Sequence, residues 1–389
     1  MLISLNEYAH ISSFLFCSLS LSLSGLWLAD CAYGCLFMTH RLDLVEFTPL
    51  PSGSGVQMLW RNPRGFHANS GEYVKVQLPW LLEGGSEWHP FSIYLNEETE
   101  EGLDKVRGIT PNRLLDDPKF SVHHTTDEEA LHLSDLRGSV FVSGAVTALG
   151  LRPFIYGCLN RDYTEMEKKS FIFKEARKEI RSQFITTQIF MVPAGDWTKQ
   201  VYEEVTNDQQ RRHCWVKGPF VSPYSAVSNF SNLVSIASGI GITPALGVMG
   251  QYKGHSRFKT LIWSTRCPKM IKFFVPLINK DATMAIIYYT GKEALSDADV
   301  KALLSGTDNI FIQQSRPESL TDTVSTIITS TESITGGTFH LSHRVDDIPL
   351  IIRQQWCLLY CGGSIFIKNM LEDYSKEVKV KFEYELFDW

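Results

Sequence analysis

The chain has 389 residues, and its 37 Lys and Arg against 43 Asp and Glu give a formal net charge of −6 at pH 7. This length suits two domains, and 44% apolar residues are enough for their cores, which excludes global disorder. The acidic balance argues against nucleic acid as the main partner, and the cysteines form no CxxC pair, which argues against a zinc site or a disulfide framework.

The segment 11–38 carries one formal charge, Asp30, and is rich in leucine and phenylalanine. Because about 20 apolar residues span a bilayer as a helix, we expect one membrane helix within residues 1–40. Its serines leave a buried or incorrectly predicted N-terminus as the alternative. A secretory signal fits less well, because Glu7 precedes the segment and no Lys or Arg does. The basic flank at Arg41 would place the following domains in the cytoplasm.

Short apolar runs separated by proline and glycine follow this segment. Residues 56–60, 73–78 and 91–95 have the composition of strands, and closely spaced strands with turns between them predict an antiparallel β-barrel. The β pattern returns at 188–192, and we expect the barrel to occupy residues 41–228.

Residues 97–182 interrupt that pattern. Their first part, 97–129, carries ten acidic and four basic residues, whereas 161–181 carries seven basic and five acidic residues. Clustered charges are typical of a solvated surface. We therefore interpret 97–182 as an insertion into the barrel, without chemistry of its own.

From residue 233 onwards, strand-like and helix-like segments alternate. The expected strands are 233–237, 260–263, 284–289 and 357–360, and the expected helices are 243–252, 268–277 and 365–375. This alternation predicts a parallel sheet covered by helices on both faces. The fold class is thus β plus α/β: an antiparallel barrel, then a parallel-sheet α/β nucleotide-binding domain at 229–389.

The strongest local motif lies at 235–244. An apolar strand ends in Gly239 and Gly241, and Thr243-Pro244 then opens a helix. Glycines let the backbone approach a pyrophosphate closely, and a helix N-terminus supplies free N–H groups. An ordinary glycine turn is the alternative interpretation, because the full dinucleotide fingerprint is absent.

Other motifs stand in a fixed order around this loop. They are Gly65-Phe66, Gly71-Glu72-Tyr73, His89-Pro90-Phe91-Ser92, Gly195-Asp196-Trp197-Thr198, Gly218-Pro219-Phe220, Cys361-Gly362-Gly363 and the ending Phe382-Glu383-Tyr384-Glu385-Leu386-Phe387. In this order the set resembles the flavin- and NADPH-binding dehydrogenase region of the NADPH oxidase and ferric reductase family, part of the ferredoxin–NADP reductase superfamily. The resemblance extends over residues 40–389 apart from the insertion.

The resemblance implies FAD and NADPH as cofactors. The residues it assigns to FAD are His89, Pro90, Phe91, Ser92, Gly195, Asp196, Trp197, Thr198, Gly218, Pro219 and Phe387. Those it assigns to NADPH are Gly239, Gly241, Thr243, Pro244, Arg266, Cys361 and Gly362. The catalytic positions are Cys361, beside the nicotinamide, and Phe387, over the flavin ring. Arginine suits a 2′-phosphate because its planar fork of donors matches phosphate oxygens, although a plain surface cation is the alternative for Arg266.

The chain also departs from the family. The family usually has a His-x-Arg pair before the Gly-Asp-Trp-Thr turn; here those positions are Phe190 and Val192, so a cation expected near the FAD pyrophosphate is missing. Lys217 is a candidate replacement, and Trp389 is an alternative to Phe387. The family's haem-bearing membrane helices have no counterpart, since His10 and His40 only flank the apolar segment.

The sequence therefore predicts a membrane-tethered or peripheral flavin-dependent NADPH oxidoreductase. It would pass a hydride from NADPH to FAD and then single electrons to an acceptor: oxygen in the manner of a superoxide-generating oxidase, a ferric chelate, or a haem-bearing membrane partner. Two alternatives stay open, a soluble haem-free flavin reductase and a catalytically weak regulatory or interaction subunit of an oxidase complex.

Overall fold

The structure, a computed structural model, describes most of the chain beyond residue 38. The described residues are 25, 32–34, 38–63, 65–69, 71–98, 184–251, 258–335 and 344–387. Most of the expected membrane helix, most of the expected insertion and Trp389 lie outside them. Within these ranges no helix is long and apolar enough to cross a membrane, and no group of His, Cys, Asp and Glu could hold a metal ion.

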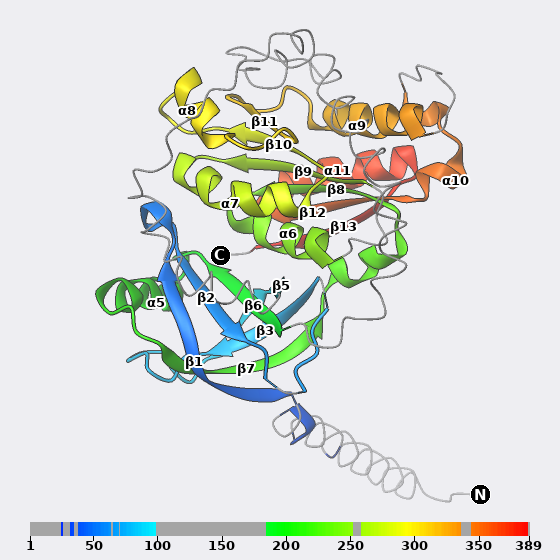
Figure 1. The fold of residues 1–389 in the computed structure, drawn as a ribbon. Helices are drawn as coiled ribbons and strands as arrows, with labels where there is room; N and C mark the ends of the chain where they lie inside the picture. The colour runs from blue at the N-terminus through cyan, green and yellow to red at the C-terminus, as the bar shows by residue number, and fades with distance from the viewer. Residues whose placement is uncertain are drawn as a thin grey trace, which may run out of the picture.

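Seven antiparallel strands form the first sheet, in the order β4-β3-β7-β1-β2-β6-β5 (Figure 1). Their bounds are β1 Thr39–Pro49, β2 Val56–Arg61, β3 Glu72–Gln77, β4 His89–Ser92, β5 Tyr94–Glu98, β6 Phe184–Met191 and β7 Arg212–Val221. The two edge strands, β4 and β5, are joined through Ile93 alone, so the sheet nearly closes on itself. The predicted antiparallel barrel is confirmed.

Side chains that point alternately to the two faces of each strand build the barrel core. In β3, Val74 and Val76 are fully buried, whereas Tyr73 and Lys75 lie on the opposite face. One helix, α5 (Asp196–Asn207), packs its buried residues Trp197, Val201 and Val205 against the barrel. Their spacing of four residues places them on one side of the helix.

The barrel corrects two details of the predicted elements. Residues 91–95 do not form one strand, because the Ile93 N–H donates to the Glu72 carbonyl (3.3 Å) and the chain passes from one edge of the sheet to the other. The expected insertion also begins too early, since Glu97 and Glu98 still belong to β5 and pair with β6.

Six parallel strands form the second sheet, in the order β11-β10-β9-β8-β12-β13. The strands are β8 Asn232–Ser238, β9 Phe258–Thr265, β10 Met284–Tyr289, β11 Ile310–Gln313, β12 Trp356–Gly362 and β13 Lys381–Leu386. The helices are α6 Ile242–Gln251, α7 Pro268–Asp281, α8 Asp297–Leu303, α9 Leu320–Thr335, α10 Leu350–Arg353 and α11 Ile365–Val378, with short 3₁₀ turns η1 Pro51–Gly53, η2 Pro223–Asn229, η3 Gly239–Gly241 and η4 Val345–Asp347. The predicted parallel α/β sheet is confirmed.

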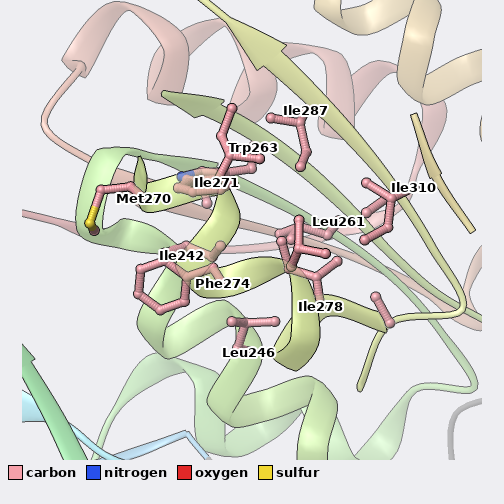
Figure 2. Close-up of a cluster of buried hydrophobic side chains, with 14 of the residues drawn as sticks. Ile242, Leu246, Leu261, Trp263, Met270, Ile271, Phe274, Ile278, Ile287 and Ile310 are labelled. Carbon is pink, nitrogen blue, oxygen red and sulfur yellow. The ribbon is translucent and has the colours of Figure 1, made fainter. Parts of the chain in front are cut away.

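Helices cover both faces of this sheet. On one face, Leu246 of α6 and Phe274 of α7 pack against Trp263 of β9 (Figure 2). On the other, Ile328 of α9 and Leu371 of α11 pack against β8, β9 and β12. Each fully buried side chain of this size contributes about 1.5–3 kcal/mol relative to exposure, so these layers supply most of the sheet's stability.

The barrel and the parallel sheet meet along β5 and α6. A Cβ atom on Gly247 of α6 would lie 2.7 Å from the Ile93 carbonyl oxygen, so only glycine lets the helix approach this closely. Nearby, the Tyr94 hydroxyl donates to the Asp281 carboxylate at 2.6 Å, and both side chains are buried. The junction thus joins the barrel's β4–β5 connection to the middle of α6 and the end of α7.

Candidate functional site

A cleft of about 370 Å³ lies between the barrel and the parallel sheet. The residues that we call the barrel wall are Tyr73, Lys75, Pro90, Phe91, Ser92, Phe190, Val192 and Thr198. Those that we call the sheet wall are Ile240, Thr243, Glu385, Leu386 and Phe387. Six positions expected from the sequence, Pro90, Phe91, Ser92, Thr198, Thr243 and Phe387, therefore border one cleft although they belong to distant motifs.

Strand pairing arranges the barrel wall. Tyr73 stands opposite Ser92, and Lys75 stands opposite Pro90, in the antiparallel β3–β4 pair. Side chains directly opposite each other lie on the same face of a sheet, so the four share the face that borders the cleft. The Tyr73 ring stacks on Phe220, with 5.3 Å between centroids.

His89 and Trp197 support this wall from outside the cleft. The His89 ring stacks on the Trp197 indole at 4.2 Å, and its Nε2 lies 3.0 Å from the Glu87 carboxylate. The Trp197 indole N–H donates to the Gly84 carbonyl (3.2 Å). The His-Pro-Phe-Ser and Gly-Asp-Trp-Thr motifs are thus held together, but these two rings do not border the cleft.

The turn before α5 is built by Gly195, Asp196 and Thr198. The exposed Gly195 N-caps the helix, and its N–H donates to the Thr198 hydroxyl (3.1 Å). Asp196 is exposed and pairs with Lys199 (3.2 Å). Of the three, Thr198 alone borders the cleft.

Close backbone packing arranges the sheet wall. Gly239 has φ = 54°, in the left-handed region that glycine adopts without strain, and its carbonyl accepts the Trp263 indole N–H (2.8 Å). A Cβ atom on Gly241 would lie 2.2 Å from the Cys361 carbonyl oxygen. Only glycine at 241 therefore lets the 239–244 loop contact the end of β12.

Buried Cys361 and half-buried Glu385 lie next to each other near the carboxyl ends of β12 and β13. They stand opposite each other in the parallel β12–β13 pair, and Cys361 is 1% exposed. Burial raises the pKa of the Cys361 thiol well above its ordinary value, and the charge of Glu385 raises it further. The thiol is therefore neutral near pH 7.

Glu385 also faces the barrel. Burial raises the pKa of its carboxyl, and a hydrogen bond donated by Ser92 partly opposes that shift. Its Oε2 atom is buried and accepts no hydrogen bond within the described part of the chain. Ser92 and Glu385 thus link the two walls, and one carboxylate oxygen is left for another donor.

The remaining expected residues lie around the cleft rather than on it. Gly218 and Pro219 lie within β7, Pro244 is buried in the first turn of α6, and Arg266 follows β9 at the carboxyl edge of the sheet. Arg266 is exposed and has no ion partner among the described residues. The Gly362 carbonyl accepts the Phe387 N–H (3.3 Å), so the two expected catalytic positions, Cys361 and Phe387, are held together.

Sequence reasoning missed Lys75 and Tyr73 as cleft residues. Phe190 and Val192, where a His-x-Arg pair was expected, do border the cleft, which therefore has no arginine at those positions. Lys217, the replacement considered from sequence, does not border it. The signal that could have found Lys75 is a lone charge on the outward-facing positions of an otherwise apolar strand.

Neither a protein-family model nor a curated protein matches the sequence. Among solved structures, a flavohemoglobin from Malassezia yamatoensis with bound FAD and heme is 15% identical with a TM-score of 0.44, covering 90% of this chain and 60% of that chain. A ferredoxin NADP+ reductase from Neisseria gonorrhoeae with bound FAD and NADP is 10% identical with a TM-score of 0.42, covering 90% and 98%.

The CS-b5R domains of human Ncb5or in the NAD+ form are 10% identical with a TM-score of 0.41, covering 89% of this chain and 69% of that chain. This chain thus spans only 60% of the flavohemoglobin's length. Identities of 10% to 15% are too low to carry an argument about what this chain binds, which depends on the cleft itself.

Proposed function

We propose that the chain is a flavin-dependent NADPH oxidoreductase of the ferredoxin–NADP reductase type, with FAD on the barrel wall and NADPH on the sheet wall. The observation that carries the proposal is the gathering of Pro90, Phe91, Ser92, Thr243 and Phe387 around one cleft. These residues come from motifs whose order resembles the dehydrogenase region of the NADPH oxidase and ferric reductase family.

The residues present fit two nucleotides. The space beside Gly239 is open, since a Cβ atom there would meet nothing within 4 Å, and Thr243 follows at the N-terminal turn of α6. Free N–H groups at such a turn suit a phosphate. Tyr73 on the barrel wall and Phe387 on the sheet wall offer aromatic surfaces for a flat ring. The free Oε2 of Glu385 offers an acceptor.

When bound, the two cofactors supply hydride exchange and the subsequent release of single electrons. The chain's own residues position them and exclude water. Ser92 donates a hydrogen bond to Glu385, and Glu385, whose pKa is raised by burial, can hold a proton at the edge of the cleft. Cys361 is buried and does not border the cleft, and burial keeps it a neutral thiol, so it packs behind the site rather than acting as a nucleophile.

The proposal also covers the electron acceptor and the cellular location of the chain. Oxygen is the acceptor that the resemblance to superoxide-generating oxidases favours, followed by a ferric chelate or a haem-bearing membrane partner. We further propose that the apolar segment 11–38 attaches the chain to a membrane, with the dehydrogenase domains on the cytoplasmic side. Recovery of the full chain in the membrane fraction after carbonate washing tests this attachment, and recovery in the supernatant contradicts it.

A titration of the full chain with FAD, followed by flavin fluorescence, tests the cofactor assignment. We expect saturable binding, and we expect Arg266→Ala to weaken NADPH binding at least tenfold while NADH binding changes little, because only NADPH carries the 2′-phosphate. Equal effects on both nucleotides would contradict the role of Arg266.

A chain that binds no FAD would instead favour the second candidate, a catalytically weak subunit. The apolar side chains of Phe190 and Val192 in the cleft already argue for this candidate.

A further inference from the structure

The cleft has one basic side chain. Phe190 and Val192 border the cleft but are apolar, whereas Lys75, on β3, borders it with a half-buried ammonium-bearing chain. Its Nζ lies 5.7 Å from the centroid of the Phe220 ring. Lys75 has no carboxylate partner anywhere in the described part of the chain.

A second lysine faces it across the sheet. Lys75 stands directly opposite Lys217 in the antiparallel β3–β7 pair, so both side chains lie on the same face. Lys217 also lacks a described carboxylate partner. Like charges directly opposite each other destabilise a sheet, and an anion beside either ammonium removes that repulsion.

The other charged group of the cleft, the Glu385 carboxyl, lies away from Lys75, at the Ser92 end of the cleft. Glu385 is hydrogen-bonded by Ser92, and Ser92 stands opposite Tyr73, two residues along β3 from Lys75. At about 3.3 Å per residue, this places the cation about 7 Å along the strand from the Ser92 end of the cleft. The cleft is thus polar at two separate points, acidic at Ser92 and Glu385 and basic at Lys75.

We propose that Lys75 binds a phosphate group of the flavin nucleotide, in place of the arginine that position 192 lacks. The inference rests on the proposed function, since it takes FAD as the ligand of the barrel wall. Phosphate is the part of FAD with full negative charge, and an ammonium without a protein partner at a half-buried site binds it as a point charge. The basic role thus moves from the residue after β6, where the family usually has an arginine, to β3.

Equilibrium binding to the full chain tests the proposal, with FAD and riboflavin as the two probes. Riboflavin has the flavin ring but no phosphate, so it separates a phosphate contact from a ring contact. The variants are Lys75→Met, Lys75→Arg and the matched control Lys217→Met, which removes the same charge from the same face outside the cleft. Far-ultraviolet circular dichroism checks that each variant is folded.

We expect Lys75→Met to weaken FAD binding by about 10- to 100-fold, the range of a charge-assisted hydrogen bond, and to change riboflavin binding by less than about twofold. Lys75→Arg should restore FAD affinity to within about threefold, because the charge is kept. FAD affinity should also fall less steeply with salt in Lys75→Met than in the wild type.

Unchanged FAD affinity in Lys75→Met would overturn the proposal, as would an equal loss of FAD and riboflavin, which would indicate a ring contact or a change of shape. A larger loss in Lys217→Met would move the role to that residue. If the wild type itself bound no FAD, the proposed function would fail first, and the role of Lys75 with it.

Discussion

The barrel wall and the sheet wall of the cleft are built in different ways. The barrel wall consists of extended strands that present half-buried side chains, with Tyr73 and Lys75 among them. The sheet wall is backed by loops that pack so closely that a side chain is excluded, as at Gly241 against Cys361. The barrel wall thus depends on half-buried strand side chains, whereas the sheet wall depends on close backbone packing behind it.

This difference predicts different responses to substitution. On the barrel wall, a change of side chain should alter ligand binding while leaving stability nearly unchanged, since the side chains are only half buried. Behind the sheet wall, a change of volume should cost stability, because buried packing has no room to adjust. Four substitutions test this contrast, ordered by the expected size of their effect.

Trp263→Ala should have the largest effect on the sheet side. The side chain is fully buried against α6 and α7, and its indole N–H holds the Gly239 carbonyl. We expect a loss of about 3–5 kcal/mol in the free energy of unfolding, measured by urea denaturation. Tyr73→Ala on the barrel wall should lose less than about 1 kcal/mol, and equal losses would remove the contrast between the walls.

Gly241→Ala should come next. The added Cβ would lie 2.2 Å from the Cys361 carbonyl oxygen and 2.8 Å from its carbonyl carbon, and backbone atoms cannot move aside as a flexible side chain can. We expect a loss of about 3 kcal/mol, the upper end for overpacking. Gly239→Ala is the matched control, because it meets open space and suffers only the strain of its positive φ, about 1 kcal/mol. A smaller loss at 241 than at 239 would contradict the close packing.

Tyr94→Phe tests the bond that joins the two halves of the molecule. It removes the buried hydrogen bond to Asp281 while keeping the ring. Hydrogen bonds to charged groups contribute about 1.5–3 kcal/mol, and we expect the lower value, about 1.5 kcal/mol, measured by thermal unfolding. A variant as stable as the wild type would show that this bond does not hold the barrel against α7.

Glu385→Gln should have the smallest effect and should depend on pH. Because burial raises the pKa of Glu385 in the folded state, the protonated form is favoured there. Below about pH 4 the carboxyl is protonated in both the folded and the unfolded state, and the wild type has its full stability. As the pH rises through the raised pKa, the wild type loses stability relative to the glutamine variant. Melting temperatures of both proteins from acidic to neutral pH measure the difference, and a constant difference would contradict the shifted pKa.

Strongly apolar elements could be predicted from the sequence. The strand expected at 284–289 coincides with β10, Met284–Tyr289, because six consecutive buried residues leave no other assignment. Strands β1 and β7 were missed because charged residues such as Arg41 and Lys217 occupy their exposed positions. Helix α9 was missed because serine and threonine, which favour other conformations locally, occupy nine of its 16 positions, and several of them bond back to its carbonyls.

The candidate site could be predicted from the sequence only in part. Pro90, Phe91, Ser92, Thr243 and Phe387 border the cleft. They were found because they belong to motifs at strand ends and loops, and the order of these motifs along the chain indicated the site. The lone charge of Lys75 is visible in the sequence, but its place beside Pro90 depends on the register of β3 against β4, which local sequence does not determine. The position of the charged side chain on the barrel wall is thus set by strand pairing and not by a sequence motif.

The most direct test of the central claim is electron transfer across the cleft. The full chain would be loaded with FAD without oxygen and mixed with NADPH, while the visible absorption of the flavin is followed. We predict that the band bleaches in a single turnover and returns when oxygen or a ferric chelate is admitted. A chain that binds FAD but keeps its absorption unchanged with excess NADPH would contradict the claim that the two walls hold two cofactors in contact.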